Sequence, residues 1–370
     1  MHKRSLACTT AVACALAAPL VARIPSPPTP QQEMEVAAAL ELGIDENMFT
    51  VNGTTRFLVF VSYFDAMDVS ATNLHSDFAY LRLKGVDGVR IFPNWWDVRQ
   101  DVWTYPSTTY YFAADTLVAP NGTLRSSSLT KFREVLDIAK QEGLLVDVSF
   151  SAESVAECAS GNCPAGAPDG AYLSLTNYRN AVANVAGILA GAGSAYKHVL
   201  FDLQNEYNLN GAGGASAFTD AQILAIRNAV KAVDPHRIVT ASLSSDLTAG
   251  LAAAKETSAD VDVIAWHESR GEGFWNVVDE AVYAIQNVNP DPPIYLQEPQ
   301  RLRQANQSWL NRQGFGADVR GAYVSGAAAW CFHNGGGFRM DGSKLQSKLQ
   351  AEEKSFLTCL VSYVYSGSCQ

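Results

Sequence analysis

Basic residues are scarce in this chain, because its 370 residues include 27 Lys and Arg against 37 Asp and Glu. The formal net charge is therefore -10. Proteins that bind nucleic acids usually carry a basic face that meets the phosphate backbone. We expect no nucleic-acid partner and a substrate that is neutral or weakly charged. The chain is 48% hydrophobic, so it has enough apolar material for a large folded core.

Motifs for metal and phosphate binding are also missing. The histidines show no His-x-His spacing and the cysteines show no Cys-x-x-Cys spacing, the patterns that many metal sites use. No glycine-rich loop follows the first predicted strand, which ends at Tyr63, although a dinucleotide-binding fold would carry one there. We therefore expect no bound metal ion and no cofactor.

Long apolar runs are absent beyond the first residues. Three basic residues precede an apolar run, Leu6–Ala18, which is too short to span a bilayer. This pattern predicts a signal peptide over residues 1–22, and the proline-rich stretch that follows predicts a linker over residues 23–35. We expect residues 36–370 to form one folded domain. We expect a secreted, monomeric protein that has no membrane span.

Two of the seven cysteines lie in the predicted signal peptide, which leaves five. Export to an oxidising compartment favours disulfide bonds. The spacing makes Cys158 with Cys163, and Cys359 with Cys369, the plausible pairs. Cys331 lies in an apolar run, so we expect it to be a buried free thiol.

Eight short apolar segments alternate with helical patterns from about residue 57 to the end, which is typical of a parallel α/β fold. The predicted strands are 57–63, 88–93, 144–150, 198–204, 237–243, 261–267, 293–298 and 322–332. Between them apolar residues recur at helical spacing, as at Phe132, Val135 and Leu136. Eight such units favour closure into a single-domain (β/α)₈ TIM barrel. Its long loops would follow strand two (94–127) and strand three (151–172).

Two acidic residues stand where predicted strands end. The pair Asn205-Glu206 follows the fourth strand, and Glu298 ends the seventh. In a barrel the carboxyl ends of the strands meet at one mouth, so both carboxylates would project into one site. Cleavage of a glycosidic bond needs two carboxyl groups, one to protonate the leaving oxygen and one to attack or to direct water. The alternatives are a structural salt bridge at Glu298 and a chance Asn-Glu dipeptide.

Three further polar residues belong to this pattern. Arg90 lies between two apolar residues of the second strand, and a buried cation needs a carboxylate partner. His267 closes the sixth strand, where it either bonds the nucleophile or the substrate or only caps the strand. His333, in a glycine-rich loop after the eighth strand, either lines a subsite or only turns the chain.

Strict alternation would point Asn205 and Glu206 to opposite sides, so both can serve one site only if the strand ends or bends there.

Aromatic residues crowd the predicted loop after the second strand. Trp95 and Trp96 lie nearest to the strand end, where exposed rings suit the faces of sugars. The alternative is that these rings pack within the loop itself. Tyr63, at the end of the first strand, is a further candidate for contact with the substrate.

Between about residues 57 and 335, the sequence resembles the large clan of retaining (β/α)₈ glycosidases at several residues, each of which lies on the matching predicted strand. These are the Asn-Glu pair ending strand four, the Glu ending strand seven, Arg90 on strand two and Trp330 ending strand eight. The member most similar is glycoside hydrolase family 5, which contains cellulases and mannanases.

The resemblance implies a role for each of these residues. Glu206 would be the general acid/base and Glu298 the nucleophile, with their carboxyl groups about 5 to 5.5 Å apart. Asn205 would bind the sugar hydroxyl beside the anomeric carbon, and Arg90 would hold Glu298 ionised. Trp330 would form the floor of the subsite that holds the cleaved sugar.

The resemblance thus implies a retaining glycoside hydrolase that cleaves β-glycosidic bonds of a poly- or oligosaccharide, of the β-glucan or β-mannan type. A transglycosylase would use the same residues and differ only in the acceptor. A glycan-binding barrel without activity and a metal-dependent barrel hydrolase are alternatives of other classes.

Overall fold

A computed structural model describes residues 40–93, 117–119, 121–151, 174–208, 218–245, 261–268, 282–283, 285–287, 290–299, 314–335 and 342–369. The predicted signal peptide and linker lie outside the described residues, as do Trp95, Trp96 and the pair Cys158 and Cys163. Most of the two predicted long loops lies outside them as well.

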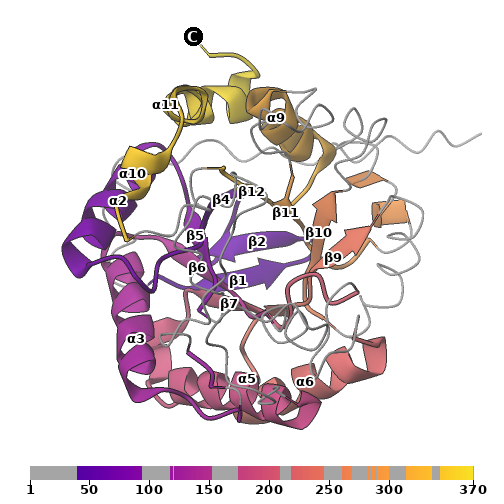
Figure 1. Cartoon of the computed structure of the whole chain (residues 1–370). Coiled ribbons are helices and arrows are strands. Elements are labelled where there is room, and N and C mark those ends of the chain that lie inside the picture. Colours follow the sequence, from indigo (N-terminus) through magenta and orange to yellow (C-terminus); the bar gives the residue numbers. More distant parts are fainter. Residues whose placement is uncertain are drawn as a thin grey trace, which may run out of the picture.

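A parallel sheet forms the centre of the molecule (Figure 1), with the strand order β8-β7-β6-β5-β4-β12-β11-β10-β9. Its strands are β4 (Leu58–Tyr63), β5 (Gly88–Ile91), β6 (Leu145–Ser149), β7 (Val199–Asp202), β8 (Val239–Thr240), β9 (Leu243–Ser245), β10 (Ile264–Glu268), β11 (Ile294–Glu298) and β12 (Ala329–Phe332). Only Ala241 and Ser242 separate β8 from β9, and these two short strands pair with β7 and β10 respectively. They are two halves of one barrel strand, so the sheet closes around eight positions. The predicted (β/α)₈ barrel is confirmed.

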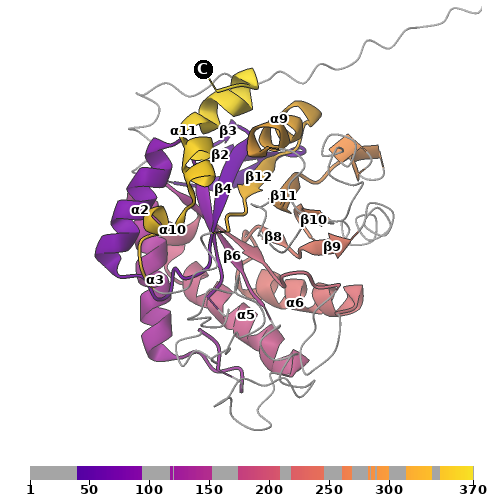
Figure 2. The same cartoon turned by 45° about the horizontal axis from the view of Figure 1, so that its top comes forward.

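Helices lie along the outside of much of the barrel (Figure 1). They are α2 (Ala71–Leu83), α3 (Ser126–Gln141), α5 (Leu175–Ala190), α6 (Asp220–Val233), α9 (Phe315–Ser325), α10 (Leu345–Lys348) and α11 (Ala351–Ser366). Figure 2 shows α9 and α11 beside each other against the strands. Thr219 begins α6 with a capping box that Gln222 completes, in which each side chain bonds the other residue's backbone N–H. Across the described ranges, no helix has the length and apolarity that a membrane crossing requires.

The predicted eighth strand, 322–332, is too long. Its first residues belong to α9, which ends at Gly326 in the left-handed conformation with φ 84°. Strand β12 begins only at Ala329. Small residues fill this stretch, and alanine and glycine do not distinguish a helix end from a strand start.

An antiparallel hairpin closes the N-terminal end of the barrel. It consists of β1 (Leu42–Asp45) and β2 (Met48–Val51), with β3 (Thr54–Thr55) beside β2. Phe49 is fully buried in a cluster with Leu58, Leu145 and Leu200, which lie at the starts of barrel strands. The sequence analysis did not predict this hairpin. Because it fills the N-terminal end, the carboxyl ends of the strands are left to form a site.

Of the two expected cysteine pairs, the described residues contain one. Cys359 and Cys369 are paired, with their Cα atoms 5.2 Å apart. Cys331, on β12, is a buried free thiol as expected.

Candidate active site

Arg90 is the centre of the charged cluster inside the barrel. Its neighbours Val89 and Ile91 pack outward toward the helices, so the alternation of β5 turns Arg90 inward, where it is fully buried. Its guanidinium donates from Nη1 to Glu298 Oε1 at 2.6 Å and from Nη2 to Asn205 Oδ1 at 2.6 Å. The expected ion pair between Arg90 and Glu298 is therefore present, and it joins strands two and seven across the barrel.

Two more carboxylates face the same guanidinium. Asp147 Oδ2 lies 3.7 Å from Arg90 Nε, and Asp202 Oδ2 lies 3.5 Å from Nη2. Burial alone would lower the pKa of Arg90. The neighbouring carboxylates, among which Glu298 has the largest effect, outweigh burial and raise this pKa. Burial also raises the pKa of Asp147 from 3.8 to about 7, although Arg90 acts in the opposite direction. The cluster thus holds a permanent cation beside several acidic groups.

Glu206 reaches the site because the chain leaves strand geometry after Asp202. Its backbone has φ 49°, in the left-handed region that only glycine enters freely. The Glu206 N–H donates to Ser242 Oγ at 2.9 Å, and the Asn205 N–H donates to the Phe150 carbonyl at 2.7 Å. The strand therefore ends and bends at this point, which lets Asn205 and Glu206 serve the same site.

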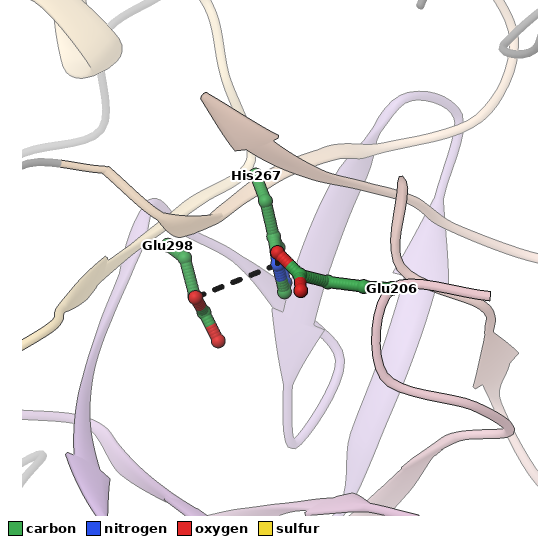
Figure 3. Close-up of side chains that lie close together, drawn as sticks. All are labelled: Glu206, His267 and Glu298. Atoms are coloured by element: carbon green, nitrogen blue, oxygen red, sulfur yellow. Dashed lines mark hydrogen bonds and ion pairs between the residues drawn. The ribbon is translucent and has the colours of Figure 1, made fainter. Parts of the chain in front are cut away.

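His267 lies between the two catalytic candidates (Figure 3). Its Nδ1 is 3.1 Å from Glu206 Oε1 and 3.6 Å from Glu298 Oε2. One carboxylate oxygen of each glutamate and a ring nitrogen of His267 all lie within 4.8 Å of one another. Glu206 keeps 20% of its side chain exposed and Glu298 keeps 10%, whereas His267 is buried. Both carboxylates therefore keep some exposed surface, and the contacts of His267 favour the functional alternative over a strand cap.

The same three side chains could also hold a cation, since each offers one ligand atom. Within the described ranges they are the one such group of three or more residues. The Glu298 carboxylate already has a partner outside this group, because Arg90 Nη1 donates to it at 2.6 Å.

Trp330 and Tyr63 do not face the site, so their predicted contacts with the substrate are wrong. Trp330 has no exposed surface, and its Nε1 donates to Asp318 Oδ2 of α9 at 2.8 Å. Tyr63 is also fully buried, and its hydroxyl donates to Asp77 Oδ2 of α2 at 2.8 Å. Both side chains occupy the outward face of their strands, in the layer between the barrel and the helices.

His333 takes the inward place that Trp330 was expected to fill. Its Nδ1 lies 3.2 Å from Ser62 Oγ, and its Nε2 lies 3.8 Å from Glu298 Oε2. The sequence analysis left His333 open, and it did not single out Asp147, Asp202 or Gln297. The signal that could have found Asp147 and Asp202 is strand alternation counted from Arg90 across neighbouring strands, because Arg90 pairs with Asp147 and Asp202 lies two residues after the partner of Asp147.

No protein-family model matches the sequence, and no match is found among well-characterised proteins by sequence. Solved structures do match. A family 5 glycoside hydrolase from Bacteroides vulgatus is 11% identical with a TM-score of 0.54, and the match covers 85% of this chain and 67% of that one. The β-mannanase of the blue mussel Mytilus edulis is 15% identical with a TM-score of 0.50, covering 85% and 98%.

An exo-β-1,4-mannosidase from an Opitutaceae bacterium is 14% identical with a TM-score of 0.57. The match covers 88% of this chain, which spans only 62% of that protein. The chain therefore has the (β/α)₈-barrel fold of glycoside hydrolases. The solved structures that it resembles include members of family 5 and mannan-cleaving enzymes.

Proposed function

We propose that the chain is a secreted retaining glycoside hydrolase that cleaves β-glycosidic bonds by double displacement. The observation that carries this proposal is the approach of a Glu206 oxygen and a Glu298 oxygen to within 4.8 Å. Retaining enzymes hold their two carboxyl groups about 5 to 5.5 Å apart, whereas inverting enzymes need about 6.5 to 9.5 Å to fit a water molecule. The close spacing supports the retaining mechanism.

In the first step Glu298 attacks the anomeric carbon and Glu206 gives its proton to the glycosidic oxygen. The bond between that oxygen and the anomeric carbon breaks, and its electron pair stays with the leaving oxygen. In the second step Glu206 takes a proton from water, whose oxygen displaces Glu298. Arg90 supports this division of roles because its fixed charge at 2.6 Å favours ionised Glu298, as a nucleophile requires. Asn205 would bind the hydroxyl beside the reacting carbon.

We propose a substrate of the β-mannan or β-glucan type. The names of the mannanase and the mannosidase among the similar structures favour β-mannan. The signal-like residues 1–22 and the pair Cys359 and Cys369 support export. Transglycosylation would use the same carboxylates, and the acceptor alone decides between the two reactions.

Aryl β-mannosides and β-glucosides test the proposal, with Glu206→Gln and Glu298→Gln as the variants and the exposed Glu352→Gln of α11 as the matched control. We expect turnover by the wild type and by the control. Loss of the general acid should lower kcat/KM by roughly 10²- to 10⁴-fold, and loss of the nucleophile should abolish turnover. Proton NMR should find the first product in the β configuration. Activity that survives in both site variants would contradict the proposal.

A chelator separates this proposal from a metal-dependent hydrolase. We expect EDTA to leave turnover unchanged, because both steps need only carboxyl groups and water. Loss of activity in EDTA that zinc restores would favour the metal enzyme.

A further inference from the structure

A row of three hydrogen bonds crosses the barrel from Asp147 to Glu206. Gln297 Nε2 donates to Asp147 Oδ2 at 2.7 Å. Gln297 Oε1 lies 2.9 Å from His267 Nε2, and His267 Nδ1 lies 3.1 Å from Glu206 Oε1. Asp147, Gln297 and His267 are all buried. The four groups come from β6, β11, β10 and the turn after β7, so the row connects four separate parts of the barrel.

The row has a fixed direction. An ionised carboxylate only accepts hydrogen bonds, so Asp147 turns the amino group of Gln297 toward itself and the amide oxygen toward His267. That oxygen needs a donor, which places a proton on His267 Nε2. A neutral imidazole then has only a lone pair at Nδ1, facing a carboxylate oxygen 3.1 Å away. Two acceptors repel at this distance, so the contact must contain a proton.

We propose that Gln297 and Asp147 are positioning residues that keep His267 protonated at Nε2, so that the contact between Glu206 and His267 retains one proton. The proton resides on Glu206 Oε1 or on His267 Nδ1, and it is the proton that passes to the glycosidic oxygen. Which ring nitrogen of His267 carries the proton depends only on the hydrogen bonds of the row. The delivery of the proton rests on the proposed function.

The other charged groups around His267 are compatible with this arrangement. Glu298 Oε2 lies 3.6 Å from Nδ1, but Arg90 neutralises Glu298 through its other oxygen. His333 approaches the same Glu298 oxygen at 3.8 Å from the β12 side. Asp202 faces Arg90 at 3.5 Å rather than His267. Because burial raises the pKa of Asp147 to about 7, the direction of the row is set most firmly above that pH.

NMR of the full chain with ¹⁵N-labelled histidine tests the histidine form directly, without any need for activity. The spectra are compared between pH 7.5 and 8.5, and His267 is assigned from the signal that the His267→Gln variant lacks. We expect Nε2 to be protonated in the wild type. In Gln297→Met we expect a shift toward the form protonated at Nδ1. The matched control is Gln286→Met, since Gln286 Nε2 donates to the Gly326 carbonyl at 3.3 Å, outside the site. A wild type in which Nδ1 carries the only ring proton overturns the proposal.

The pH dependence of kcat/KM tests the retention of the proton. In Gln297→Met an Nδ1–H donor would favour ionised Glu206, so we expect the alkaline limb to move down by about one pH unit. Gln297→Glu restores an acceptor for Nε2 and should restore the limb, which also covers the case in which Gln297→Met folds poorly. If Gln297→Met changes which ring nitrogen of His267 is protonated but leaves the alkaline limb of kcat/KM unchanged, the proposal that the contact retains a proton is overturned. A wild type without turnover whose His267 is protonated at Nε2 overturns the proposed function and leaves the positioning role standing.

Discussion

The backbone of Glu206 carries a strain that its side chain cannot relieve. At φ 49° the Cβ atom crowds the backbone, which costs roughly 1–2 kcal/mol for a residue other than glycine. Hydrogen bonds hold the turn, because Ser242 Oγ accepts from the Glu206 N–H and the Ser242 carbonyl accepts from the Tyr207 N–H. Strain of this kind is typical of functional sites, where the surrounding structure sets the conformation.

This strain predicts an unusual order of stability. We expect Glu206→Gly to have a free energy of unfolding about 1 kcal/mol higher than Glu206→Ala, because glycine has no Cβ. Urea denaturation of the two variants measures the difference. At the exposed Asn228 in the middle of α6 the order should be reversed, with the alanine variant about 1 kcal/mol more stable. Equal stabilities of the two Glu206 variants would show that the turn is not strained.

At the scale of the element, β12 shows what the sequence can and cannot predict. Barrel strands are buried on both faces, so an apolar run reveals the strand but not which residues point inward. The pairing of Cys331 with Phe60 of β4 fixes the inward face, which places His333 in the site and Trp330 outside it. Arg90 was predictable because a lone charge in an apolar strand requires acidic partners. Trp330 was not, since a large aromatic side chain suits either face.

The outward position of Trp330 predicts that its loss affects stability and not catalysis. Trp330→Phe removes the donor to Asp318, which should lower the free energy of unfolding by about 1–3 kcal/mol. The KM for a β-glycoside should stay within about twofold, because the ring has no exposed surface. Denaturation and steady-state kinetics of the purified variant check both values. A tenfold rise in KM at unchanged stability would restore the role of Trp330 in a sugar subsite.

For the whole molecule, the alternating strands and helices were sufficient to predict a closed barrel, because each unit carries its own local pattern. The N-terminal hairpin was not predicted, because Phe49 packs in a cluster with Leu145 and Leu200, which lie far away in the sequence. Part of the site was not predicted for the same reason, since Asp147 and Gln297 are 150 residues apart in the sequence. Sequence patterns report local structure, whereas these contacts depend on closure of the barrel.

The packed barrel also holds an uncharged histidine away from the site. Burial lowers the pKa of His198 from 6.5 to about 4. Between these pH values His198 binds a proton in the unfolded chain but not in the folded protein, so falling pH favours unfolding. Relative to His198→Asn, the wild type should lose up to about 3 kcal/mol of unfolding free energy between pH 6.5 and pH 4. Urea denaturation of both proteins across this range measures the difference, and parallel curves would contradict the buried neutral state.

The most direct test of the central claim is to trap the nucleophile. A 2-fluoro β-glycoside with a good leaving group forms the glycosyl-enzyme and slows its hydrolysis, so the sugar stays attached to the attacking carboxylate. Mass spectrometry of the peptides from the inactivated protein then locates the sugar. The account predicts a single label on Glu298, with Arg90 beside it at 2.6 Å and His267 at 3.6 Å. A label on another residue, or turnover by one-step inversion without any label, would contradict it.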